Sequence, residues 1–245
     1  MNSTTFLGYS ERGIFNSIVF YLSEHTEKIT QFLEVLGINN KTYDDASKYT
    51  FLLEPSFSDF GTCDLVIIIE NQQNKNKTVI FIEGKVKTMQ GYFSLEKEFK
   101  KLNNCKEKFK GISSNIFVQL YYKYLLTKVL QKGESNTGFL NIKDIFKKNR
   151  NSNRYIGKNE IVKRTIEKYI KFASNYYYVA IIPEVKFSTE DFQEKFIKSL
   201  ELFEDEDIAN IKCANWKDIE EIFADNNIVA NIVAEHFVHN KGQIY

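Results

Sequence analysis

Two short segments decide the fold: Asp64-Leu65-Val66-Ile67-Ile68-Ile69-Glu70 and, after a polar loop, Val79-Ile80-Phe81-Ile82-Glu83-Gly84-Lys85. Each is an aliphatic run that ends in polar residues, which is typical of a buried strand. If the two strands pair as a hairpin around the loop 71–76, the numbers of opposed residues add up to about 147. Asp64 is then expected opposite Glu83.

The side chains of a strand alternate between its two faces, so Glu83 and Lys85 are expected on one face and Ile80 and Ile82 on the other. Two carboxylates opposed across a strand pair lie about 5 Å apart. They repel each other unless they share a cation. Oxygen ligands of this kind suit Mg²⁺ or Mn²⁺, which can polarise a phosphate and lower the pKa of an attacking water. The pattern favours a site for phosphodiester hydrolysis.

Hydrophobic spacing and turn residues predict the elements around this hairpin. The predicted helices are 10–35 (long or broken), 93–130, 189–203 and 216–223, and the predicted strands are 49–53, 64–70, 78–86, 176–183 and 208–214. We therefore expect an α/β fold in which a mixed central sheet is flanked by helices. The length of 245 residues and the presence of two prolines favour a single domain over residues 1–245.

Composition excludes several classes of protein. The net charge of +1 argues against a polybasic protein, and the longest apolar run, 65–69, is too short for a membrane span. The cysteines Cys63, Cys105 and Cys213 are odd in number and widely spaced, so neither a disulfide framework nor a zinc knuckle is expected. A soluble protein of the reducing cytoplasm, without a membrane partner, is the expectation.

Asp64, eighteen intervening residues and then Glu83-Gly84-Lys85 resemble the signature of the PD-(D/E)xK, or restriction-endonuclease-like, nuclease superfamily. The stretch YSERGIFNSIVFYL places Glu11 where that family often carries a glutamate on its first helix. Cys63 stands where the signature usually has proline. The resemblance covers residues 10–130 as the core, with 176–223 similar to the family's later strands and helices.

The resemblance implies a function and a site. Asp64 and Glu83, with the accessible backbone of Gly84, would form the site for Mg²⁺ or Mn²⁺. Lys85 would serve the attacking water, and Glu11 would be a further ligand or orienting group. Gln90 is a candidate for a site-facing residue on the following helix. The implied activity is metal-dependent hydrolysis of DNA, in bacterial defence or DNA processing, and the family often cleaves duplexes as a homodimer.

Charge is distributed unevenly along the chain. Residues 85–110 hold eight lysines against three acids, and residues 141–171 hold ten lysines or arginines against three acids. Residues 184–225 hold thirteen acids against five lysines. The basic segments are expected either to contact phosphates or to be solvated helix faces, and the acidic segment is expected to face away from nucleic acid.

Other interpretations stay open. One alternative is a chain that keeps the nuclease-like fold but only binds nucleic acid or a protein partner. Another is an α/β interaction protein in which Glu83 and Lys85 form a surface pair. Asp64 on the opposite sheet face would favour the latter. His236 and His239 are spaced like a helical metal pair, although such a pair near the end of a sequence is more often incidental.

Overall fold

The computed structural model describes residues 7–38, 40–44, 46–87, 92–105, 113–131, 154–223 and 232–244. In these residues one mixed sheet has the strand order β1-β2-β3-β4-β5. The strands are β1 (Lys48–Leu53), β2 (Leu65–Glu70), β3 (Lys77–Gly84), β4 (Asn175–Ile182) and β5 (Ile211–Asn215). β1, β2 and β3 form an antiparallel meander, and β4 and β5 continue the sheet in parallel with β3.

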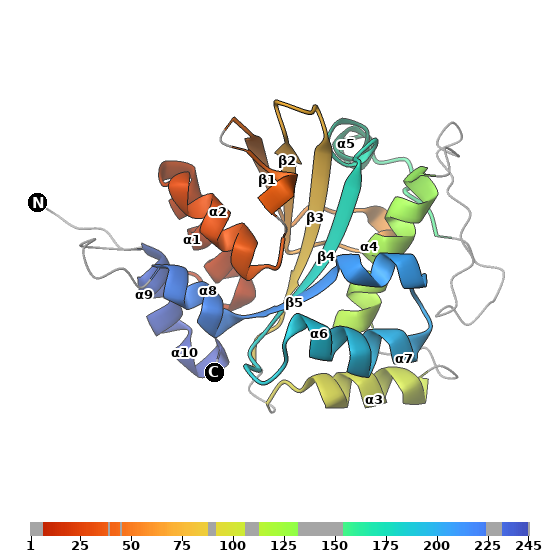
Figure 1. The fold of residues 1–245 in the computed structure, drawn as a ribbon. Coiled ribbons are helices and arrows are strands. Elements are labelled where there is room, and N and C mark those ends of the chain that lie inside the picture. The colour runs from red at the N-terminus through yellow and green to blue at the C-terminus, as the bar shows by residue number, and fades with distance from the viewer. Residues whose placement is uncertain are drawn as a thin grey trace, which may run out of the picture.

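Helices cover both faces of this sheet (Figure 1). The helices are α1 (Ser10–Glu24), α2 (Glu27–Val35), α3 (Leu95–Cys105), α4 (Ile116–Gln131), α5 (Glu160–Thr165), α6 (Thr189–Phe192), α7 (Lys198–Leu200), α8 (Trp216–Phe223), α9 (Ile232–His239) and α10 (Lys241–Ile244). Short helical segments are η1 (Asn40–Thr42), η2 (Ser58–Phe60), η4 (Ile166–Ile170), η5 (Gln193–Ile197) and η6 (Asp205–Asn210).

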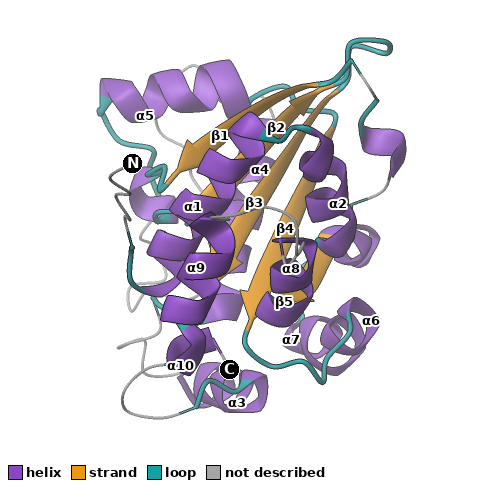
Figure 2. Ribbon diagram, turned by 90° about the vertical axis from the view of Figure 1, so that its left-hand side faces the viewer, coloured by secondary structure: helices purple, strands orange, loops and turns teal. Residues whose placement is uncertain are grey.

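The two faces of the sheet build two separate cores. One core joins odd-numbered residues of β2, such as Ile67, and even-numbered residues of β3, such as Ile80, to α1, α2, α8 and α9. The other joins Val66 and Phe81 to α3, α4 and the segment α6–α7. Figure 2 shows the first layer, with α1, α2, α8 and α9 in front of the strands. Because both faces are covered, the central parts of β2 (65–69) and β3 (79–82) are continuous apolar runs instead of alternating with polar residues.

Most of the predicted elements are present, and the predicted α/β class with a mixed sheet is confirmed. The predicted first helix is broken into α1 and α2, and the predicted helix 93–130 consists of α3 and α4. The hairpin register is the predicted one, since Leu65 lies opposite Ile82 and Glu70 opposite Lys77. No helix in the described ranges is long and apolar enough to cross a membrane.

Candidate active site

The predicted pair of carboxylates lies where β2 begins and β3 ends. Asp64 immediately precedes β2, and its Oδ2 accepts a hydrogen bond of 2.7 Å from the backbone N–H of Gly84. Its carbonyl oxygen accepts a hydrogen bond of 3.1 Å from the N–H of Glu54, so the meander continues one residue beyond β2. The register places Asp64 opposite Glu83, on the face that α4 covers. The register therefore does not show the opposite-face position of Asp64 that would have favoured the interaction-protein interpretation.

Glu83 is completely buried. Its Oε1 lies 3.0 Å from Nζ of Lys123 in α4, and the side chains of Glu83 and Lys123 are 0% and 1% exposed. Among the described residues, neither carboxylate oxygen of Glu83 has a hydrogen-bond partner of good geometry, so the contact with Lys123 is an ion pair without an aligned hydrogen bond. A buried charge with unfilled acceptor positions is costly unless a ligand completes it. Glu83 is thus not part of a surface pair with Lys85.

The surroundings shift the ionisation of both carboxyl groups. Burial raises the pKa of Glu83; Lys123 opposes this rise and Asp64 adds to it. Burial also raises the pKa of Asp64, against the opposing effects of the Gly84 N–H, Lys85, Lys123 and Arg12. The carboxylates are therefore close enough to repel each other, which is the condition that a shared cation relieves.

Lys85 follows β3, and its backbone is fixed from two sides. Its N–H donates a hydrogen bond of 2.8 Å to the carbonyl of Ile181, and its carbonyl accepts one of 2.7 Å from Nε1 of Trp216. Its half-buried ammonium lowers the pKa of both Asp64 and Glu83. The charge of Lys85 therefore acts on both carboxyl groups.

Gly84 allows two helices to approach the end of β3. A Cβ atom at this position would lie 2.8 Å from Cε2 of Phe15, 3.1 Å from Cζ2 of Trp216 and 3.2 Å from Cβ of Glu11. The first turn of α1 therefore lies against the backbone that follows Glu83, which brings Glu11 to the same end of the sheet. Glu11 approaches from the α1 face, whereas Asp64 and Glu83 belong to the α4 face.

The loop before Asp64 is held by Lys123 and Cys63. Nζ of Lys123 donates to the carbonyls of Phe60, at 3.1 Å, and Thr62, at 3.0 Å. The thiol of Cys63 donates to the carbonyls of Leu65, at 3.3 Å, and Ile82, at 3.2 Å. Cys63 thus bridges β2 and β3 where the family signature has proline, and burial raises its thiol pKa well above the ordinary value.

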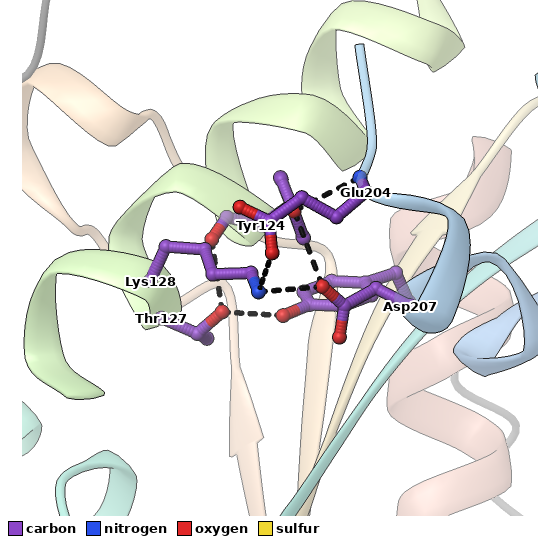
Figure 3. A network of polar contacts seen from close by, with 6 residues as sticks. Tyr124, Thr127, Lys128, Glu204 and Asp207 are labelled. Carbon is purple, nitrogen blue, oxygen red and sulfur yellow. Dashed lines mark hydrogen bonds and ion pairs between the residues drawn. The ribbon is translucent and has the colours of Figure 1, made fainter. Parts of the chain in front are cut away.

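A second group of acids lies elsewhere. Three acidic side chains in the described ranges have potential metal-ligand atoms within 4.8 Å of one another: Glu204, Glu206 and Asp207. We call these residues the acidic cluster. Lys128 of α4 forms ion pairs of 2.6 Å with both Glu204 and Asp207, and Tyr124 donates to Asp207 at 3.2 Å (Figure 3). Lys128 therefore already supplies a positive charge to the acidic cluster, and Tyr124 supplies a hydrogen-bond donor.

The other sequence-based candidates are a histidine pair near residue 236 and several residues that the structure does not describe. His236 accepts from the N–H of Gly8 through Nε2, at 3.0 Å, and its Nδ1 lies 2.8 Å from the carbonyl of Ile232. Both ring nitrogens thus have backbone partners, which does not fit a metal ligand. Gln90, the side chain of Cys105, residues 106–110 and residues 141–153 lie outside the described part of the chain.

Sequence reasoning missed two side chains of α4. Lys123 contacts Glu83 directly. Gln119 lies one turn earlier on the helix, and its buried Oε1 has no hydrogen-bond partner among the described residues. The signal was present, since a glutamine and a lysine four residues apart interrupt the otherwise apolar and aromatic stretch IFVQLYYKYLL.

Comparisons of the chain with models of protein families, with curated proteins and with solved structures found no significant match.

Proposed function

We propose that the chain is a metal-dependent nuclease of restriction-endonuclease-like fold that hydrolyses phosphodiester bonds of DNA. The observation that carries this proposal is the buried carboxylate of Glu83, which faces Asp64 across the strand pair and lacks aligned hydrogen-bond donors in the described structure. A divalent cation would relieve both the repulsion and the unfilled acceptors.

The arrangement of elements supports the same proposal. A first helix, a meander that carries Asp64 and Glu83-Gly84-Lys85, further helices and two parallel strands follow one another as in the family that the sequence resembles. The donor set fits a hard cation, because Asp64 and Glu83 offer carboxylate oxygens. Mg²⁺ or Mn²⁺ at these oxygens would supply charge for polarising the phosphate and acidifying water.

The residues of the chain would share the remaining tasks. The Gly84 N–H fixes one oxygen of Asp64, which leaves the other oxygen for a ligand. Lys85 would orient the attacking water or offset the charge that develops on the phosphate, because its ammonium is a compact donor beside both carboxylates. Glu11, at the start of α1, would orient water or complete the ligand set from the other side of Gly84.

Charge near this end of the sheet supports a nucleic-acid substrate, and the choice of DNA comes from the family resemblance. Lys85 and Lys87 follow β3 directly, and Arg12 neighbours Glu11 on α1 with a side chain that is 69% exposed. Such cations bind phosphates without reading sequence. A role in bacterial defence or DNA processing, and cleavage by a homodimer, are further parts of the proposal that come from the family resemblance alone.

One observation favours a second candidate function. Lys123 already places a positive charge on Glu83, so the pair can persist without a metal. The chain would then be a module that binds nucleic acid or a protein partner and does not cleave. Binding of a divalent cation at Asp64 and Glu83 separates the two candidates.

The experiment compares wild type with Lys85→Ala on supercoiled plasmid and on single-stranded DNA, each with Mg²⁺, Mn²⁺ or a chelator. Lys186→Ala, which removes an exposed lysine paired with Glu96, is the control for loss of charge. Cleavage that requires metal, is lost in Lys85→Ala and persists in Lys186→Ala supports the nuclease. Absence of cleavage by wild type on every substrate, together with absence of metal binding, contradicts it.

A further inference from the structure

The ammonium of Lys123 lies inside the protein with three oxygen partners. They are Oε1 of Glu83, at 3.0 Å, and the carbonyl oxygens of Phe60, at 3.1 Å, and Thr62, at 3.0 Å. Two protons of the ammonium are donated to the two carbonyl oxygens, and Oε1 of Glu83 lies within ion-pair distance of the same group. A buried ammonium without such partners would destabilise the fold strongly.

These oxygens belong to the segments that form the proposed metal site. Phe60 and Thr62 precede Asp64 in the loop that leads into β2, and Glu83 lies opposite Asp64. One carboxylate and two carbonyls are also the kind of oxygen donors that a hard divalent cation accepts. The structure therefore has a position beside the carboxylates whose surrounding oxygens suit a positive charge. The ammonium of Lys123 occupies that position.

A divalent cation and Lys123 would compete for the same carboxylate. Each stabilises ionised Glu83, and each repels the other at short range, where the interior screens charge less than water does. Lys123 thus stabilises the protein without metal at the expense of metal affinity.

We propose that Lys123 is an internal counterion for Glu83 that keeps the metal-free site folded and lowers its affinity for a divalent cation. This inference rests on the proposed metal site. Lys123 would act on the metal site through its contact with Glu83. Lys85 has a different role, which concerns the attacking water. The site would consequently fill only when the concentration of divalent cation is high enough to overcome the charge of Lys123.

The direct test is calorimetric titration of Mn²⁺ into wild type and Lys123→Gln. Glutamine retains two N–H donors for the carbonyls of Phe60 and Thr62 but removes the charge. The expected result is a dissociation constant for Mn²⁺ at least about tenfold lower than that of wild type. The control Lys163→Gln removes a half-buried lysine paired with Glu160 on α5 and should leave the constant unchanged.

Thermal unfolding provides a second readout. Lys123→Gln and Lys123→Met should melt below wild type in a chelator, and Mn²⁺ should raise their melting temperatures more than it raises that of wild type. The double variant Lys123→Met/Glu83→Gln removes both charges, so it should regain metal-free stability and lose the response to Mn²⁺. A single variant that is unfolded both with and without Mn²⁺ overturns the inference, because metal then cannot replace the ammonium.

The outcomes separate this inference from the proposed function. If wild type and Asp64→Asn bind Mn²⁺ equally, or wild type binds none, the proposed metal site itself is wrong. If wild type binds Mn²⁺ through Asp64 but Lys123→Gln binds it no more tightly than wild type does, the metal site stands and the role of Lys123 as a competing counterion is wrong.

Discussion

Two lysines of α4, five residues apart, pair with acids in opposite ways. Lys123 is 1% exposed and contacts Glu83, a single carboxylate that is itself completely buried. Lys128 is 19% exposed and contacts two carboxylates, those of Glu204 and Asp207, at the edge of the acidic cluster. A lysine of α4 therefore pairs with acids twice: Lys123 in the buried interior and Lys128 closer to the surface.

The difference lies in how completely the acids are satisfied. Around Lys128, burial alone would lower the pKa of the ammonium, but hydrogen bonds from it to Asp207 and Glu204 outweigh this effect and raise its pKa. Around Lys123, the oxygens of Glu83 lack aligned donors within the described structure, and burial raises the pKa of the carboxyl. Proximity of acids alone points to the acidic cluster, whereas the metal site that we propose at Asp64 and Glu83 rests on the unfilled acceptors of Glu83.

The largest expected effect concerns DNA cleavage. Asp64→Asn should lower the rate of metal-dependent plasmid nicking by about a thousandfold, because the amide removes a charged oxygen from the proposed metal site. Asp207→Asn changes an acid of the same type in the acidic cluster and should leave the rate within about twofold of wild type. Equal loss of activity in both variants would remove the functional distinction between the two regions.

The next effect is on stability. Lys123→Met leaves a buried carboxylate without its counterion and should lower the free energy of unfolding by about 3–5 kcal/mol. Lys128→Met exposes its acidic partners to water and should cost about 1 kcal/mol or less. Urea unfolding of both variants in a chelator measures the difference. Similar losses for the two lysines would show that burial does not separate them.

The smallest expected effect is on stability at alkaline pH, through Tyr124, which lies beside Lys128. Burial raises the pKa of Tyr124 to about 12, although the N–H of Glu204 and the charge of Lys128 oppose the rise. Because the folded pKa exceeds the unfolded value of 10.0, the contribution of Tyr124 to stability is complete below pH 10 and is lost as pH rises towards 12.

Spectrophotometric titration of tyrosinate tests this expectation. Tyr124→Phe should abolish an ionisation step near pH 12 and reduce the loss of stability between pH 10 and pH 12. Tyr92→Phe, which changes a tyrosine that is 76% exposed, should leave that step in place. A step near pH 12 that persists in Tyr124→Phe contradicts the assignment.

Much of the fold was predictable because local pattern and tertiary packing agree in the hairpin. The aliphatic runs at 65–69 and 79–82 are buried on both faces, and the symmetric loop between them predicted the register that places Asp64 opposite Glu83. Lys85 follows the end of β3, and its expected position on the face of Glu83 extends the alternation of that strand by one residue and stays a prediction.

Lys123 was not predictable in the same way. Its partners, Phe60, Thr62 and Glu83, lie 40 or more positions away in the sequence, and only the packing of α4 on the sheet brings them together. A lysine within an apolar helix indicates a buried charge but does not identify its partner. Gln90, the sequence-based candidate for a site-facing residue on the helix after β3, lies outside the described residues.

Binding of Mn²⁺ measured by calorimetry on wild type, Asp64→Asn and Asp207→Asn tests the central claim most directly, because it requires neither a substrate nor an assumption about cleavage. We expect one Mn²⁺ site in wild type that is retained in Asp207→Asn and lost in Asp64→Asn. Binding that is lost in Asp207→Asn and retained in Asp64→Asn would contradict it, since the metal would then belong to the acidic cluster; absence of binding to wild type would contradict it equally.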